Sequence, residues 1–261
     1  MKKTIFLALP LVTGAVGFLG RAAEIRLGFD SATGLAVGHV ISTVLPLYLA
    51  AAAILYLVLS WRQPAGRQGL SAGFETPQGP LPVLLAGILL TIAGGGWLMA
   101  LSLQSSLLDL LLGALSVVSG CAMFAAVKQW RQGEAPGGLL LAPVLLYVAW
   151  LLLTYKNYAD FPVTARFYVE VLALAALTLA AYQAAAFAYG IGSRRWFCVS
   201  AAMAVTLGCT ALADSVSLPV LVLYGGAVLQ IYGLWLCQRT DAPETAESQE
   251  TEGSGENAPG E

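Results

Sequence analysis

The chain has 261 residues, of which 58% are hydrophobic and 11% charged, and its mean hydropathy is +0.75. About a quarter of the residues of soluble proteins are charged, so this composition excludes a water-soluble domain and indicates an integral membrane protein. The formal charge of −2 conceals two unlike regions: thirteen Lys and Arg against eight acids leave residues 1–240 at +5, whereas seven acids leave residues 241–261 at −7.

The apolar runs predict an all-α, polytopic bundle of eight transmembrane helices over residues 1–238. A bilayer core about 30 Å thick needs roughly 20 apolar residues per helix, because lipid offers no partner to an unpaired backbone group. The expected spans are approximately Thr4–Gly20, Leu35–Ser60, Leu81–Leu103, Leu107–Val127, Leu139–Thr154, Phe167–Gly190, Trp196–Ala213 and Leu218–Cys237.

The first span begins with Met-Lys-Lys and has an apolar run of 17 residues. A secretory signal peptide is the alternative, but its apolar region is usually about 7–15 residues long and is followed by a clean small-residue cleavage site. We therefore interpret this segment as an uncleaved helix. Residues 21–34 are expected to form the first outer loop, in which Asp30 begins a turn before the second span.

The loops predict that both chain ends face the cytoplasm. With the N-terminus inside, nine Lys and Arg fall on the cytoplasmic side and four on the outer side, as the positive-inside rule requires. The expected location is the cell membrane, taken to be the bacterial cytoplasmic membrane. Residues 61–80 contain three prolines and four glycines and are expected to be a flexible cytoplasmic linker. The acidic tail, residues 239–261, lacks aromatic and branched aliphatic residues and is predicted to be disordered.

Small residues indicate where helices pack, because apolar side chains gain nothing by leaving lipid for one another. The third span carries consecutive glycines at Gly94, Gly95 and Gly96, which allow either a close neighbour or local unwinding around a ligand. The sixth span has an alanine stripe that includes Ala176, Ala180 and Ala184, so we expect this span at the centre of the bundle.

Residues 155–170, YKNYADFPVTARFYVE, are rich in charged residues and tyrosines and follow the outer end of the fifth span. Arg166 and Glu170 are four residues apart and can pair on one helix face. One interpretation is a polar mouth whose cations hold a carboxylate or zwitterionic ligand; the other is an interfacial belt of tyrosines and solvated charges. The candidate ligand-binding residues are Lys156, Asp160, Arg166 and Glu170, with Asp30 and Asp214 from other outer segments.

No enzyme motif, metal-ligand spacing or cofactor signature is present, so we expect neither catalysis nor a bound metal or cofactor. His39 stands alone and is interpreted as a hydrogen-bonded helix residue. The span centres hold no carboxylate or histidine, which argues against a carrier built on a midplane acid.

Two functions remain from the sequence. One is a small-molecule permease or the membrane subunit of a transporter; the other is a non-transporting scaffold or sensor component that binds partner helices. A permease is expected to contain a cavity that reaches the midplane near the glycines of the third span, and a scaffold to be packed solid. The expected partners are the lipid bilayer and other membrane subunits, with no nucleic acid.

Overall fold

The computed structural model describes residues 3–29, 40–61, 63, 66–74, 81–100, 107–158, 167–214 and 217–238. Within them are eight helices long and apolar enough to span a membrane, which confirms the predicted fold class. The predicted acidic tail lies outside the described residues, as do Asp30, His39, Asp160 and Arg166. The long helices are α1 (Lys3–Leu27), α2 (Ile41–Ser60), α4 (Leu81–Met99), α5 (Leu107–Arg131), α6 (Gly137–Tyr158), α7 (Tyr168–Ala188), α8 (Arg194–Ala211) and α9 (Leu218–Leu236).

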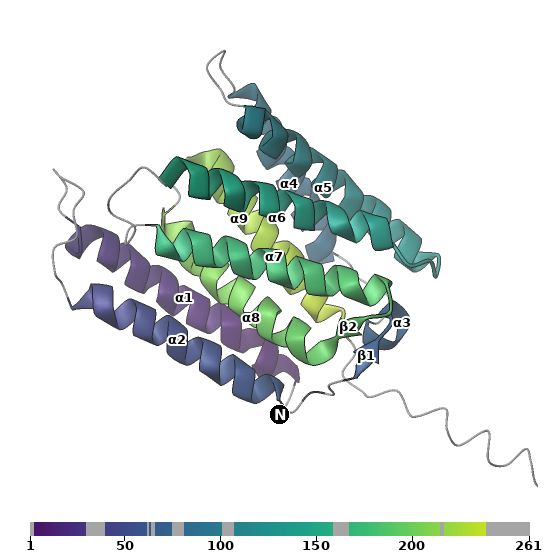
Figure 1. Ribbon diagram of the computed structural model, residues 1–261, viewed down its shortest axis with the longest axis horizontal. Helices are drawn as coiled ribbons and strands as arrows, with labels where there is room; N and C mark the ends of the chain where they lie inside the picture. Colours follow the sequence, from purple (N-terminus) through teal and green to yellow (C-terminus); the bar gives the residue numbers. More distant parts are fainter. Residues whose placement is uncertain are drawn as a thin grey trace, which may run out of the picture.

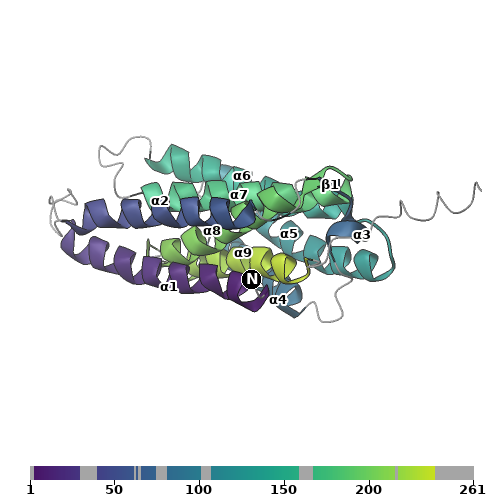
Figure 2. The same cartoon turned by 90° about the horizontal axis from the view of Figure 1, so that it is seen from below.

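The long helices lie side by side along one common direction (Figures 1 and 2). The pair α1 and α2 forms one edge of the bundle and the pair α4 and α5 forms the opposite edge (Figure 1). Between them, α7 packs against α6 and α8, while α9 packs against α4 and α8. The edge helices contact central helices from the C-terminal part of the chain: α1 and α2 contact α8, and α4 contacts α9.

The helix most enclosed by its neighbours is α8, the seventh span, rather than the alanine-rich sixth span. Of the residues in the apolar stretch of each helix, 67% are buried in α8 and 50% in α7. Ala201, Ala202 and Ala204 of α8 are fully buried, and small residues of this kind let neighbouring backbones approach closely. The alanine stripe of α7 still faces inward, with Ala180 and Ala184 buried and Ala176 packed at the margin of the core.

Buried hydroxyl groups tie the first two helices to α8. Tyr56 of α2 hydrogen bonds to Thr206 of α8 at 2.7 Å and to Thr13 of α1, and the two threonine oxygens lie 3.1 Å apart. Lipid could not replace these partners, so the three hydroxyls favour one arrangement of α1, α2 and α8.

A second polar contact joins the other half of the bundle. The Tyr147 hydroxyl of α6 donates to Gln230 of α9, whose side-chain amide in turn points at the sulfur of Met123 in α5, 3.2 Å away. All three side chains are buried. This contact gives α5, α6 and α9 a shared polar link within an otherwise apolar interior.

The segment after α2 is ordered in part, which corrects the expectation of a flexible linker. Strand β1 (Arg67–Gln68) pairs antiparallel with β2 (Gly192–Ser193) just before α8, and the short helix α3 (Leu70–Gly73) follows. Phe74 is then buried, and its ring packs edge-on against three others, those of Trp130, Phe187 and Phe197. The burial of this one aromatic side chain thus fixes the position of a segment whose sequence has no helix or strand periodicity. We call this end of the bundle the Phe74 end.

The three consecutive glycines of α4 have unlike surroundings. A Cβ at Gly94 would lie 2.7 Å from the Gly113 carbonyl oxygen and 2.8 Å from the Val117 nitrogen, both backbone atoms of α5. A Cβ at Gly95 or Gly96 would meet nothing within 4 Å. Gly94 is therefore the position at which α4 and α5 approach most closely among these three.

We predict that Gly94→Ala destabilises the protein by about 1–3 kcal/mol, because backbone atoms of α5 cannot move aside as a side chain could. Gly95→Ala is the matched control and should be neutral or stabilising by up to about 1 kcal/mol, since alanine favours the helix. Equilibrium unfolding in mixed detergent micelles measures both free energies. Equal losses in the two variants would contradict the assignment of Gly94 to the α4–α5 contact.

The membrane orientation is also open to direct test. Arg67 and Glu134 are exposed at the Phe74 end, while Asn157 and Ser217 are exposed at the opposite end. From the positive-inside count, we predict that single cysteines at positions 67 and 134 react with an impermeant thiol reagent only after cell lysis, and those at 157 and 217 in intact cells. The four native cysteines are replaced first. The reverse pattern would refute the cytoplasmic placement of the termini.

Candidate functional site

The first helix is longer than the sequence indicates, and this brings charge into the bundle. Residues 21–27 continue α1 instead of forming a loop, so Arg21 lies about 9 Å before the helix end at the usual rise of 1.5 Å per residue. Arg21 is completely buried and Glu24 is 2% exposed. The charges of Arg21 and Glu24 predicted the end of the first span. In the structure the two side chains are buried together, and their opposite charges neutralise each other.

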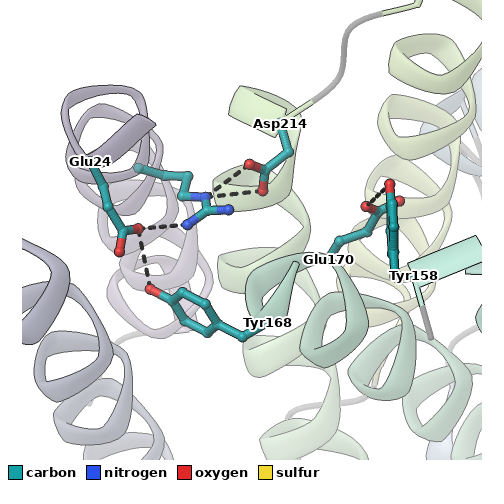
Figure 3. Close-up of polar contacts among 6 residues, drawn as sticks. Glu24, Tyr158, Tyr168, Glu170 and Asp214 are labelled. Atoms are coloured by element: carbon teal, nitrogen blue, oxygen red, sulfur yellow. Dashed lines mark hydrogen bonds and ion pairs between the residues drawn. The ribbon is translucent and has the colours of Figure 1, made fainter. Parts of the chain in front are cut away.

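Arg21 binds carboxylates from two parts of the chain (Figure 3). Its Nη1 donates to Glu24 Oε2 at 2.6 Å, and its Nε lies 2.9 Å from Asp214 Oδ1 and 3.1 Å from Oδ2. Asp214 ends the short 3-10 helix η2 (Leu212–Asp214) that follows α8. The ion pairs therefore fix the end of α8 against α1.

Tyr168, the first residue of α7, completes this charged cluster. Its hydroxyl donates to Glu24 Oε2 at 3.4 Å, and the Arg21 guanidinium lies 5.3 Å from the centre of its ring. That distance is within the range of a cation–π contact. Helices α1 and α7 and the η2 turn consequently meet around one guanidinium.

Glu170 lies two residues further along α7 and points to a different neighbour (Figure 3). The Tyr158 hydroxyl, at the end of α6, donates to Glu170 Oε2 at 3.0 Å. The ring of Tyr158 stacks on Phe167, with ring centres 3.5 Å apart. The expected partner, Arg166, lies outside the described residues, so its pairing with Glu170 stays a prediction.

A pocket of about 210 Å³ opens beside this cluster, and we call it the Glu170 pocket. Helices α4, α6, α7 and α9 and the η2 turn contribute to its wall. Its acidic lining residues are Glu170 and Asp214, and its aromatic ones are Trp97, Trp150, Tyr158 and Tyr224. Trp150 and Tyr224 are almost wholly buried, with ring centres 4.3 Å apart.

The hydroxyl of Tyr224 is the one polar group of the Glu170 pocket that is buried without a hydrogen-bond partner among the described residues. The side chain is 1% exposed. Glu170 is close enough to interact with it electrostatically, yet no hydrogen bond of acceptable geometry joins the two groups. A buried hydroxyl without a hydrogen-bond partner is uncommon in proteins and calls for an explanation.

The structure brings together two of the predicted ligand-binding residues, Glu170 and Asp214, from segments over 40 positions apart. Lys156 is exposed on the last turn of α6 and does not line the pocket. The sequence reading missed Trp150 and Tyr224, which were counted only as apolar span residues. It also assigned Arg21 and Glu24 to a loop, although their spacing of three is a signal for one helix face.

A second cavity of about 370 Å³ lies at the Phe74 end, lined in part by Leu70, Trp130 and Glu134. None of its described lining residues has a buried polar side chain without a hydrogen-bond partner. Among the described residues, no group of three or more His, Cys, Asp or Glu could hold a metal ion. The Glu170 pocket is therefore the better candidate for a ligand site.

No protein-family model matches this sequence, and no curated protein or solved structure matches it.

We predict that Arg21→Gln destabilises the protein by about 3–5 kcal/mol, because it leaves two buried or half-buried carboxylates without their cation. Arg26→Gln is the matched control, since Arg26 is exposed on the same helix, and it should cost less than about 0.5 kcal/mol. Unfolding in mixed micelles measures both. Similar values for the two variants would show that the Arg21 ion pairs do not stabilise the fold.

Proposed function

We propose that the protein is a small-molecule permease, or the membrane subunit of a transporter, and that the Glu170 pocket is its ligand site on the outer side. The observation that carries this proposal is the combination of a carboxylate, buried aromatic rings and an unpartnered buried hydroxyl in one pocket. Small-molecule sites are typically concave, mostly apolar and furnished with a few convergent polar groups.

The depth of the pocket supports this reading. Trp150 lies eight residues before the end of α6 and Tyr224 six residues after the start of α9. At 1.5 Å per residue these positions are about 12 Å and 9 Å from the helix ends, roughly a third of a bilayer core. An interfacial belt of tyrosines does not require an indentation of this depth.

The cavity expected at the midplane is absent beside Gly94. The void there has no room for water, because the backbone of α5 occupies the space that the glycine leaves. Fully buried residues such as Leu146 and Leu177 fill the interior between the Glu170 pocket and the cavity at the Phe74 end. The Glu170 pocket and the cavity at the Phe74 end, with a packed region between them, fit a carrier that opens to one side at a time.

The scaffold alternative has two observations in its favour. The first is the packed interior beside Gly94, because a scaffold is expected to be packed solid. The second is that Gly95 and Gly96 present space on α4 that a partner helix could approach. The other small-residue faces named from the sequence are occupied within the chain: Ala180 and Ala184 are buried, and Gly94 contacts α5. The scaffold therefore has less surface to offer than the sequence suggested.

Thiol accessibility from each side tests transport without knowledge of the substrate. Thr154 lines the Glu170 pocket and is 4% exposed, Ser217 marks the pocket side and Glu134 the opposite side. In vesicles, we predict that Thr154→Cys reacts with an impermeant reagent from the Ser217→Cys side and, more slowly, from the Glu134→Cys side. Two-sided access is expected because a carrier exposes its site alternately.

Val118→Cys, on the lipid-facing side of α5, is the control for leakage and should react from neither side. If Thr154→Cys reacts only from the Ser217→Cys side under all conditions, the permease proposal is wrong and the scaffold is favoured.

A further inference from the structure

We infer that the Glu170 pocket binds a small organic cation, an ammonium group that is held by Glu170 and enclosed by aromatic rings. This inference rests on the proposed function for the transport of that ligand, but binding can be tested separately. It also departs from the sequence expectation of a carboxylate or zwitterionic ligand.

The charges around the pocket favour a cation. Among the described residues, the guanidinium of Arg21 is hydrogen bonded to Asp214 and Glu24, while Glu170 accepts a hydrogen bond from the neutral hydroxyl of Tyr158. Three carboxyl groups, those of Glu24, Glu170 and Asp214, therefore lie near one guanidinium among the described residues. A carboxylate withdrawn from water is stabilised by a nearby cation, so the acidic residues of the described lining favour a positively charged ligand.

The lining gives an anion nothing to bind. None of the described residues that line the pocket is Lys, Arg or His. Lys156, which the sequence analysis placed in the ligand site, is exposed away from the lining. An anionic ligand would therefore face Glu170 and Asp214 without compensation from the described wall.

The aromatic side chains explain why an organic cation is favoured over a metal ion. Trp97, Trp150, Tyr158 and Tyr224 line the pocket. Ammonium groups are attracted to the faces of aromatic rings, Trp most strongly, and quaternary ammonium ligands are commonly recognised in this way. A metal ion would instead require several oxygen, nitrogen or sulfur ligands, and the described residues hold no such group.

Tyr224 supplies a second sign of a ligand. Its hydroxyl is buried, lines the pocket and has no hydrogen-bond partner among the described residues. A hydroxyl can donate to a ligand oxygen or accept from an ammonium N–H. A hydroxylated ammonium compound would satisfy this group and Glu170 at once.

The volume limits the size of the ligand. About 210 Å³ is below the range of roughly 300–1,000 Å³ typical of sites for drug-sized molecules. Choline has the right size, charge and hydroxyl group, and we choose it as the probe. Its neutral isostere, 3,3-dimethyl-1-butanol, has the same shape without the positive charge.

The experiment is a tryptophan-fluorescence titration of the purified full chain in detergent micelles, since two of its six tryptophans line the pocket. We predict a saturable change with choline chloride and none with sodium chloride at equal ionic strength or with the neutral isostere. Glu170→Gln should weaken the apparent affinity at least about tenfold, because it removes the charge that pairs with the ammonium. Glu134→Gln, the same change at an exposed site, should leave the affinity unaltered.

Tyr224→Phe is a second variant that keeps the ring and removes the hydroxyl, so it also tests the site if Glu170→Gln fails to fold; it should weaken binding about three- to tenfold. The inference is overturned if the neutral isostere or sodium chloride reproduces the effect of choline, or if choline has no effect on the folded wild type. Choline binding with one-sided thiol access would retain the ligand class and discard the permease. Two-sided access without a choline response would do the reverse.

Discussion

Hydrocarbon offers no hydrogen-bond partner to a buried polar group, and this constraint decides how the helices of this bundle meet. Each polar side chain must find its partner within the chain or remain unsatisfied at considerable cost. The hydroxyl cluster of Thr13, Tyr56 and Thr206 and the contact between Tyr147 and Gln230 meet the constraint across helices that are far apart in sequence. Apolar packing fills the space between these links and specifies the arrangement less strictly.

The same constraint gives Arg21 its importance. A lone guanidinium at that depth would end the span, but Glu24 and Asp214 let α1 continue through it. The ion pairs also hold the η2 turn, which carries Asp214 to the wall of the Glu170 pocket. A structural interaction thus shapes the site, because the ion pair with Arg21 fixes the position of Asp214.

The two ends of the bundle are chemically unlike. At the Phe74 end, aromatic rings pack edge-on against one another, and a short β-pairing joins the segments that precede α3 and α8. The Glu170 end carries the ion pairs, the acidic pocket and the unpartnered hydroxyl of Tyr224. Aromatic packing therefore orders one end of the bundle, and ion pairs order the other.

Much of the fold was predictable because membrane insertion depends on local sums of hydropathy. Eight helices followed from the apolar runs alone, since each span must be long enough and apolar enough by itself. The limits of α1 were not predictable in this way, because Arg21 is tolerated only through Asp214, which is 193 positions away. Likewise, a composition of glycine and proline predicted a flexible segment where the burial of Phe74 among three distant rings imposes order.

The sequence by itself determined that the protein lies in a lipid bilayer, how many helices are long and apolar enough to span it, and which segments are rich in charged residues. All three depend on residues close together in the chain. Tertiary structure alone decided that Gly94 rather than Gly95 faces α5, and that Glu170 and Asp214 share a pocket with Trp150 and Tyr224 while Lys156 does not. These outcomes depend on how helices rotate and pair, and pairing is governed by contacts between distant residues that no local pattern encodes.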